Sequence, residues 1–376
     1  MHTGFRLSGI VIILLLMMLC GIPCQAAENE DAMNALYDAA ESLDIPEEAR
    51  QQLAESGISA SEPESVLMLT PAEMLRNLLK TAADEAAAPL RFCGVLLSVT
   101  MLSALFGGMN DAAVQPSVRQ MFDTFCTLIC VGCAAEPLCA CLIRTAEALK
   151  TGQVFMGSYV PVFTAFLAAG GSVAGGAAYQ VFVLFLTECI MQLANGALFP
   201  LLQTAAALGI ADAVNPKLNL GKLVSGMRSA VTWILGTVMA LFSGLLTIRS
   251  FVASAADSLA AKSVKLLASS AIPVIGGAVS DAYGTVQGSI QLLRSGTGAV
   301  GMLVIFWLTL PPVISLLLYR AVFSLMHLFA DMAGAKQMAQ LYQNAQSVLS
   351  AAFAILICFA VMLILSTAIM LMLIRS

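Results

Sequence analysis

Residues 351–374 read AAFAILICFAVMLILSTAIMLMLI and contain no charged side chain. A run of this length and composition predicts a helix that crosses the hydrocarbon core of a bilayer. Six further apolar runs precede it, so residues 90–376 are predicted to form an all-α, polytopic transmembrane helical bundle. The expected spans are 90–108, 120–143, 154–170, 178–202, 230–249, 299–319 and 350–374.

The composition of the whole chain supports a membrane protein. Apolar residues make up 59% of the chain and charged residues 11%, and the mean hydropathy is +0.88. A soluble domain of this size does not bury so much apolar surface, so lipid is expected to be the main solvent. The chain has 28 glycines and only 2 tryptophans, which indicates helices packed through small residues.

A weaker apolar block lies at 264–283 and is interrupted by polar and flexible residues. It contains Pro273, Gly276, Gly277 and Asp281. Irregular backbone at membrane depth is tolerated where protein or water surrounds it. We therefore expect a re-entrant or discontinuous element here, which brings the count to about seven or eight spans.

A second broken element is expected around Pro161, followed by Gly170 and Gly171. Both glycine-rich stretches are candidates to line a cavity and to offer backbone carbonyls or amides to a solute. The alternative interpretation is structural, a short turn in the first case and close helix packing in the second.

A candidate internal repeat relates residues 119–202 to residues 231–314. Each copy is expected to contain a long span, a short Pro/Gly-broken element and a second long span. Three crossings per copy would invert the second copy relative to the first, as in many transporters. Three residue pairs, each 112 positions apart, suggest the repeat: Lys150 and Lys262, Pro161 and Pro273, and Pro200 and Pro312.

The amino-terminal residues 1–26 read as a signal peptide. His2 and Arg6 form a basic start, an apolar stretch follows at 10–19, and the small residue Ala26 precedes the expected cleavage point. An uncleaved membrane anchor is the alternative. In either case the acidic residues 27–89 are expected to form a small helical extracytoplasmic segment.

Two short helices are predicted within this acidic segment. The first begins near Asp44 and ends at Gly57. The second begins at Thr70-Pro71-Ala72-Glu73, which is a capping box with proline at the first helical position. It is expected to lie on the membrane surface or against the bundle until Pro89 turns the chain into the first span.

Ionisable residues inside apolar runs are candidate functional residues. Glu188, Gln192 and Asn195 form a polar stripe at helical spacing, and Glu136 lies within the second expected span. A carboxylate in lipid is costly, so each is expected to face the bundle interior. The stripe suits a proton or cation pathway, and a hydrogen bond between packed helices is the alternative.

The sequence offers no assembly of catalytic residues, no cofactor motif and no strong metal site. His2 lies in the expected signal peptide and His327 stands alone, so no histidine-based acid–base pair is predicted. Cys130 and Cys133 have a metal-like spacing within a cysteine-rich span. Small apolar packing residues are the better interpretation of these cysteines, since no second pair accompanies them.

Several of these features, in this order, define a recognisable pattern. It consists of an acidic exported segment and a polytopic body with five short motifs: Tyr159-Val160-Pro161-Val162, Gly170-Gly171, the run from Gly276 to Ala282, Gly288-Ser289 and Pro311-Pro312. The chain resembles the stage III sporulation protein AE family of endospore-forming bacteria over most of its length from about residue 65. The family supplies no catalytic residue to transfer.

The resemblance implies a multi-pass protein of the mother-cell membrane around the forespore. Its partners would be other membrane proteins of the sporulation channel complex and the lipid bilayer, with no nucleic acid, and a homo-oligomer is an open alternative. The protein would be the permease-like conducting subunit of that complex, a scaffold that recruits channel partners, or a stand-alone secondary transporter. The acidic outer segment would suit docking of a basic partner domain.

Overall fold

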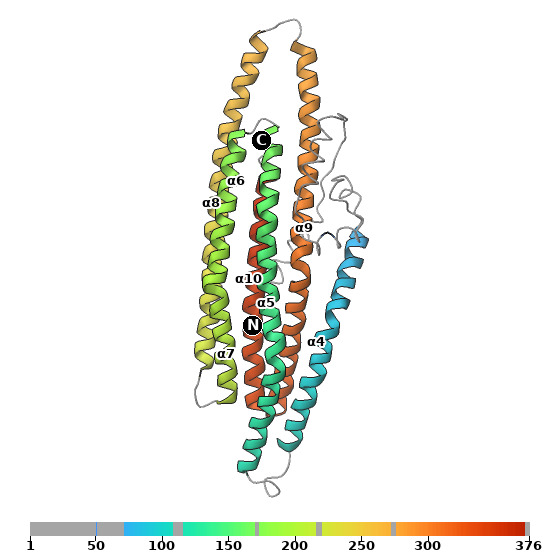
Figure 1. The fold of residues 1–376 in the computed structure, drawn as a ribbon, viewed down its shortest axis with the longest axis vertical. Coiled ribbons are helices and arrows are strands. Elements are labelled where there is room, and N and C mark those ends of the chain that lie inside the picture. The colour runs from blue at the N-terminus through green and yellow to red at the C-terminus, as the bar shows by residue number, and fades with distance from the viewer. Residues whose placement is uncertain are drawn as a thin grey trace.

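The computed structural model describes residue 50 and residues 71–107, 116–169, 173–215, 220–271 and 276–372. Within these residues the chain is helical and contains no strand, and its long helices run up and down an elongated bundle (Figure 1). The predicted signal peptide at 1–26 lies outside the described residues, and so does the first predicted acidic helix apart from residue 50, which is helical. The elements are α4 (Pro71–Gly107), α5 (Pro116–Ala169), α6 (Val173–Leu193), the π-helical turn η2 (Ala194–Leu198), α7 (Phe199–Val214), α8 (Gly221–Ala271), α9 (Gly276–Met332) and α10 (Lys336–Met372).

Six helical stretches in the described part of the chain are long and apolar enough to cross a membrane. The predicted all-α bundle is therefore confirmed, while the predicted seven or eight spans exceed this number. The six stretches are Leu75–Leu105, Met121–Ala165, Gln180–Val214, Gly221–Leu245, Gly298–Met332 and Lys336–Ala368.

The two spans predicted at 120–143 and 154–170 are not separate helices, because α5 contains the first completely and the second up to Ala169. This helix is 54 residues long, or about 80 Å. The connection expected between the spans is helical because its inner face stays packed: Thr145, Ala148 and Leu149 are all buried. The charged residues of this stretch occupy the outer face and do not interrupt the helix.

The start of α4 at Pro71 agrees with the predicted capping box, but its course past Pro89 does not. The helix continues through Pro89 to Gly107 over 37 residues. An interior proline removes one backbone hydrogen bond and normally costs about 3 kcal/mol. Here Leu78 and Phe92, on either side of the proline, both pack against the core, so tertiary contacts hold the helix together.

The element expected to be re-entrant at 264–283 is divided between two long helices. The chain is helical up to Ala271 and again from Gly276, while Pro273 lies outside the described residues. Both helix ends lie beyond the apolar stretches 221–245 and 298–332 and rise past the other helices in Figure 1. The described part of this block thus extends the bundle and does not re-enter it.

The candidate repeat is not reproduced as three crossings per copy. Residues 119–202 contain α5, α6, η2 and the start of α7, whereas 231–314 contain parts of α8 and α9 only. Pro161 lies inside α5 and Pro200 near the start of α7, but Pro312 lies in the interior of α9. With one helical hairpin per copy, no inversion follows, and the repeat itself stays a prediction.

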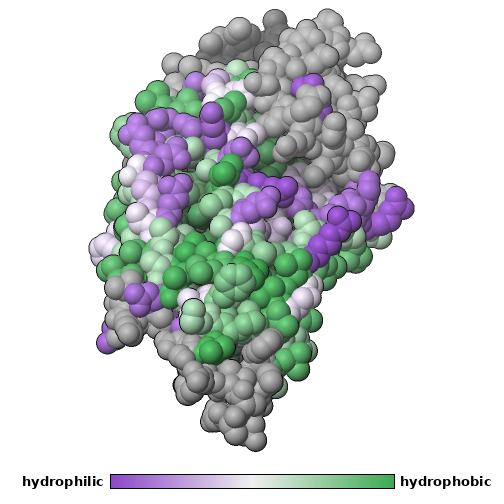
Figure 2. All heavy atoms as spheres, turned by 60° about the horizontal axis from the view of Figure 1, so that its bottom comes forward, coloured by the Kyte–Doolittle hydropathy of each residue, from purple (hydrophilic) through white to green (hydrophobic). Residues whose placement is uncertain are grey.

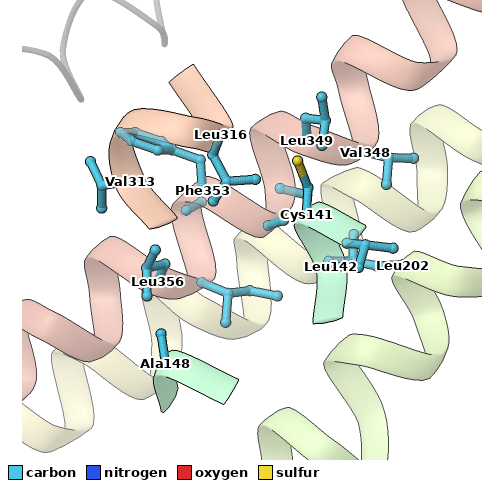
Figure 3. Close-up of a cluster of buried hydrophobic side chains, with 14 of the residues drawn as sticks. Cys141, Leu142, Ala148, Leu202, Val313, Leu316, Val348, Leu349, Phe353 and Leu356 are labelled. Atoms are coloured by element: carbon cyan, nitrogen blue, oxygen red, sulfur yellow. The ribbon is translucent and has the colours of Figure 1, made fainter. Parts of the chain in front are cut away.

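The centre of the bundle is the hairpin of α9 and α10, which make the most extensive helix–helix contact in the molecule. Figure 3 shows side chains of α5, α7, α9 and α10 meeting there, among them Cys141, Leu202, Leu316 and Phe353. Because lipid is as apolar as these side chains, close van der Waals packing is the main source of their association.

Glycine permits the closest approach in this core. A Cβ atom at Gly301 of α9 would lie 2.4 Å from the ring of Tyr159 of α5. Tyr159 is fully buried and has Phe155 and Phe163 as aromatic neighbours. Gly301 therefore sets the distance between the two helices.

Candidate functional site

The predicted polar stripe exists, but it lies on the outside of the bundle. Glu188, Gln192 and Asn195 are all exposed. Gln153 of α5 donates a hydrogen bond to Glu188 Oε2 at 2.5 Å, and Gln192 donates to Oε1 at 3.3 Å. The stripe is therefore a small network that links α5 to α6.

The outward position of Glu188 follows from the helix period. The inner face of α6 and η2 carries the buried residues Val183, Thr187, Met191 and Ala194. Residues one position later in the sequence lie about 100° around the helix and point away from the core. The expectation that Glu188 faces the interior was therefore wrong for a single copy of the chain.

Asn195 lies in the π-helical turn η2, which joins α6 to α7 without a break. Such a turn inserts an extra residue into the helix and changes the register of everything after it. π-Helical turns of this kind are frequent at functional sites. Because η2 lies at the end of the stripe, the outer face of α6 and η2 is a candidate functional surface.

Other polar residues extend the outer surface along α5. Glu147 and Lys150 are exposed, and Arg144 forms a salt bridge of 3.1 Å with Glu85 of α4. Glu136 is also exposed, contrary to expectation. In the view of Figure 2, hydrophilic side chains form a band across the surface above a largely hydrophobic region.

The predicted glycine and proline elements are spread along the chain, and their role in lining a cavity stays a prediction. Pro161 is within α5, and Gly170 and Gly171 lie outside the described residues. Gly276 and Gly277 form the first turn of α9, and Asp281 follows in the same helix. These last three positions belong to the far extension of α9.

The cysteine-rich part of α5 packs into the core. Cys130 is buried, and its Sγ lies 3.2 Å from the hydroxyl of Tyr342, which also contacts Thr100 at 2.9 Å. No group of three or more metal-ligating side chains comes together among the described residues. The arrangement connects α4, α5 and α10 through one tyrosine.

A polar site that the sequence did not predict lies where α7 and α9 end and α8 and α10 begin. Asp212 of α7 is completely buried. Its carboxylate accepts a hydrogen bond of 2.7 Å from the backbone N–H of Leu220, and another from the side-chain amide of Gln340. Asp212 thus caps the start of α8 and ties it to α10.

Two further contacts complete this polar region. Asn344 of α10 donates a hydrogen bond of 3.1 Å to the carbonyl of Gly209, and a Cβ at Gly209 would lie 2.9 Å from Asn344. His327 Nδ1 lies 3.0 Å from the carbonyl oxygen of Ala339, which connects α9 to α10. These contacts border a cavity of about 500 Å³.

Comparison with known proteins agrees with the sequence motifs. Residues 63–373 match the family described as Stage III sporulation protein AE. This range includes every helix from α4 to α10.

The chain belongs to the stage III sporulation protein AE family.

A curated relative named Stage III sporulation protein AE, from Bacillus subtilis (strain 168), is 22% identical over 256 residues. The match covers 68% of this chain and 64% of the relative, so it spans less than two thirds of that protein's length. No solved structure shows significant similarity to the chain. By family the chain is thus a stage III sporulation protein, and six of its described helices are long and apolar enough to cross a membrane.

In this member of the stage III sporulation protein AE family, the buried site around Asp212 left only a faint signal in the sequence. Its residues lie far apart in the chain, so spacing alone does not connect them. The signal that was present is the polar start of α10, where Gln340, Gln343, Asn344 and Ser347 recur at helical spacing. Such a stripe at the end of an apolar run indicates a polar contact face.

Proposed function

We propose that this protein is a membrane subunit of the channel complex that joins mother cell and forespore. It would lie in the mother-cell membrane around the forespore, with its acidic amino-terminal segment between the two membranes. Family membership and six apolar helices support this placement. The net negative charge of the outer segment suits a basic domain of a partner protein.

The observation that carries the molecular role is the exposed Glu188 network on the largely apolar helix α6. A carboxylate that faces lipid is costly, so this face favours contact with another protein or with water. We infer that the α5–α6 face packs against another membrane protein of the complex. Any hydrated path would then run between subunits, along the stripe of Glu188, Gln192 and Asn195.

A path through a single copy is the second candidate, and the polar cavity at the end of α7 favours it. Above that cavity, however, the centre of the bundle is filled with apolar side chains such as Leu349, Phe353 and Leu356. Conduction through one copy would require these helices to separate. The interface role needs no such change, so it is preferred.

The test is the heat-resistant spore count of cells with Glu188→Gln or Glu188→Leu, with membrane level and co-purification of complex partners measured in the same cells. We expect fewer spores and weaker co-purification at normal membrane level. Asp84→Asn is the matched control, since Asp84 is an exposed carboxylate on α4, away from α6, with no hydrogen-bond partner among the described residues. Normal spores and normal co-purification with Glu188→Leu would refute the proposal.

Asp281→Asn separates the two candidates further. Asp281 lies on the far extension of α9, away from the α5–α6 face. The interface role predicts normal co-purification for Asp281→Asn. Loss of spores in Asp281→Asn with an intact complex, combined with full function of Glu188→Leu, would instead support a path formed by the α8 and α9 ends.

A further inference from the structure

The cavity at the end of the bundle has the size of a ligand site. Its volume is about 500 Å³, within the range typical of small-molecule pockets. The first turns of α8 and α10 and the last turns of α9 form its walls. Several of its residues, including Ser225, Asp331 and Gln343, are exposed, so the cavity is open at the surface.

The charged side chains of the cavity favour an anion. Arg228 of α8 and Lys336 of α10 line it, and Asp331 is the single carboxylate in the lining. Neither cation has an ion-pair partner in the described part of the chain. Arg320 of α9 lies close enough to Arg228 for their like charges to interact. An anion bound in the cavity beside Arg228 would offset that repulsion, although Arg320 itself does not line the cavity.

The carboxylate of Asp212 does not act as the anion in the cavity, because Asp212 lies behind the residues that line it. It is fully buried and bonded to the Leu220 N–H and to the Gln340 amide. Asp212 therefore already accepts one backbone N–H at the amino end of α8, and the side-chain cations are the groups left to bind a ligand. His327 and Ser347 also line the cavity and add polar groups around them.

We propose that this cavity binds a small phosphate-bearing molecule, with Arg228 as the main contact and Lys336 as the second charge. The arginine guanidinium matches a phosphate through two parallel hydrogen bonds, and lysine supplies a point charge. The same phosphate chemistry has two sources, a free phosphorylated solute or the headgroup of an anionic lipid. The binding site does not depend on the interface role proposed for the α5–α6 face.

The test uses the full chain in nanodiscs, with sn-glycerol 3-phosphate as the soluble probe and glycerol as its uncharged counterpart. One set of discs contains phosphatidylcholine only, and a second set adds phosphatidylglycerol. Thermal unfolding and calorimetric titration report binding. The variants are Arg228→Gln and Lys336→Gln, and Lys222→Gln is the matched control, an exposed lysine on α8 outside the cavity lining.

We expect glycerol 3-phosphate to bind and to raise the unfolding temperature in phosphatidylcholine discs, while glycerol has no effect. Arg228→Gln should weaken binding about tenfold or more, because a charged hydrogen bond is lost. Stabilisation by phosphatidylglycerol alone, lost in Arg228→Gln and Lys336→Gln, would assign the phosphate to a lipid. No stabilisation by either probe, or stabilisation that both variants retain, would overturn the proposal.

Discussion

The central hairpin of α9 and α10 and the outer helix α8 differ in how much of each the protein itself covers. In α9 and α10, 67% of the most apolar window is buried inside the bundle, whereas in α8 the share is 17%. The central helices are therefore positioned by side-chain packing within one chain. Helix α8 leaves large side chains such as Trp233 and Leu241 for lipid or another protein to cover.

This difference predicts that the same substitution has opposite consequences in the two regions. Gly301→Leu in α9 places a side chain where even a Cβ would lie 2.4 Å from the Tyr159 ring. We expect the free energy of unfolding to fall by more than the roughly 1–3 kcal/mol typical of overpacking, because Tyr159 is enclosed and cannot move aside. Thermal unfolding in detergent and the level of protein in the membrane measure the effect.

Gly236→Leu in α8 is the matched control, since a Cβ there meets nothing within 4 Å. Leucine is also a better helix former than glycine by about 1 kcal/mol. The control should therefore unfold at the same or a higher temperature. Equal destabilisation at both glycines would mean that the two regions are not packed differently.

The second prediction removes the contact that ties the outer helices to the centre. Asp212→Ala leaves the Leu220 N–H and the Gln340 amide without their acceptor. Both donors are only partly buried, so each loss should cost less than the roughly 1–3 kcal/mol of a fully buried unsatisfied group, and the variant should still be less stable to heat. Asp212→Asn keeps one acceptor oxygen and should recover part of the loss. Equal stability of Asp212→Ala and the unaltered protein would show that α8 is held without this carboxylate.

The third and smallest effect is expected for Tyr342→Phe within the central region. The change removes the hydroxyl that contacts Thr100 and Cys130. Thr100 keeps its hydrogen bond to the carbonyl of Leu96, so the free energy of unfolding should fall by only about 1 kcal/mol. Thermal unfolding should detect it, and Tyr319→Phe serves as the control because no hydrogen bond of its hydroxyl occurs among the described residues. Identical behaviour of the two variants would contradict a structural role for the Tyr342 hydroxyl.

The sequence was sufficient for the helical membrane fold and for the start of α4, because apolar length and helix capping are local properties. Sequence patterns predicted wrong helix ends where tertiary packing outweighed local helix-breaking signals. Pro89 did not end α4, and the charged stretch after Cys141 did not end α5, since buried neighbours held both helices.

The faces of the helices and the polar cavity were beyond the reach of sequence patterns. The stripe of Glu188 was found from its spacing, but spacing does not say whether a stripe faces inward or outward. Asp212, Arg228, His327 and Gln340 come from four different helices. Their proximity depends on how those helices pack, which no local motif encodes.

The position of the central hairpin in the chain has a consequence for biosynthesis. Chains are made from the amino terminus, so α9 and α10 leave the ribosome after helices α4 to α8. Until they arrive, the inner faces of α4, α5 and α7 lack the partners that later bury them. The earlier helices contact one another but lack the central hairpin until it is made. Packing of the bundle is then completed only after α10 has been made, and we expect a nonsense mutation before α9 to leave a chain without its central core.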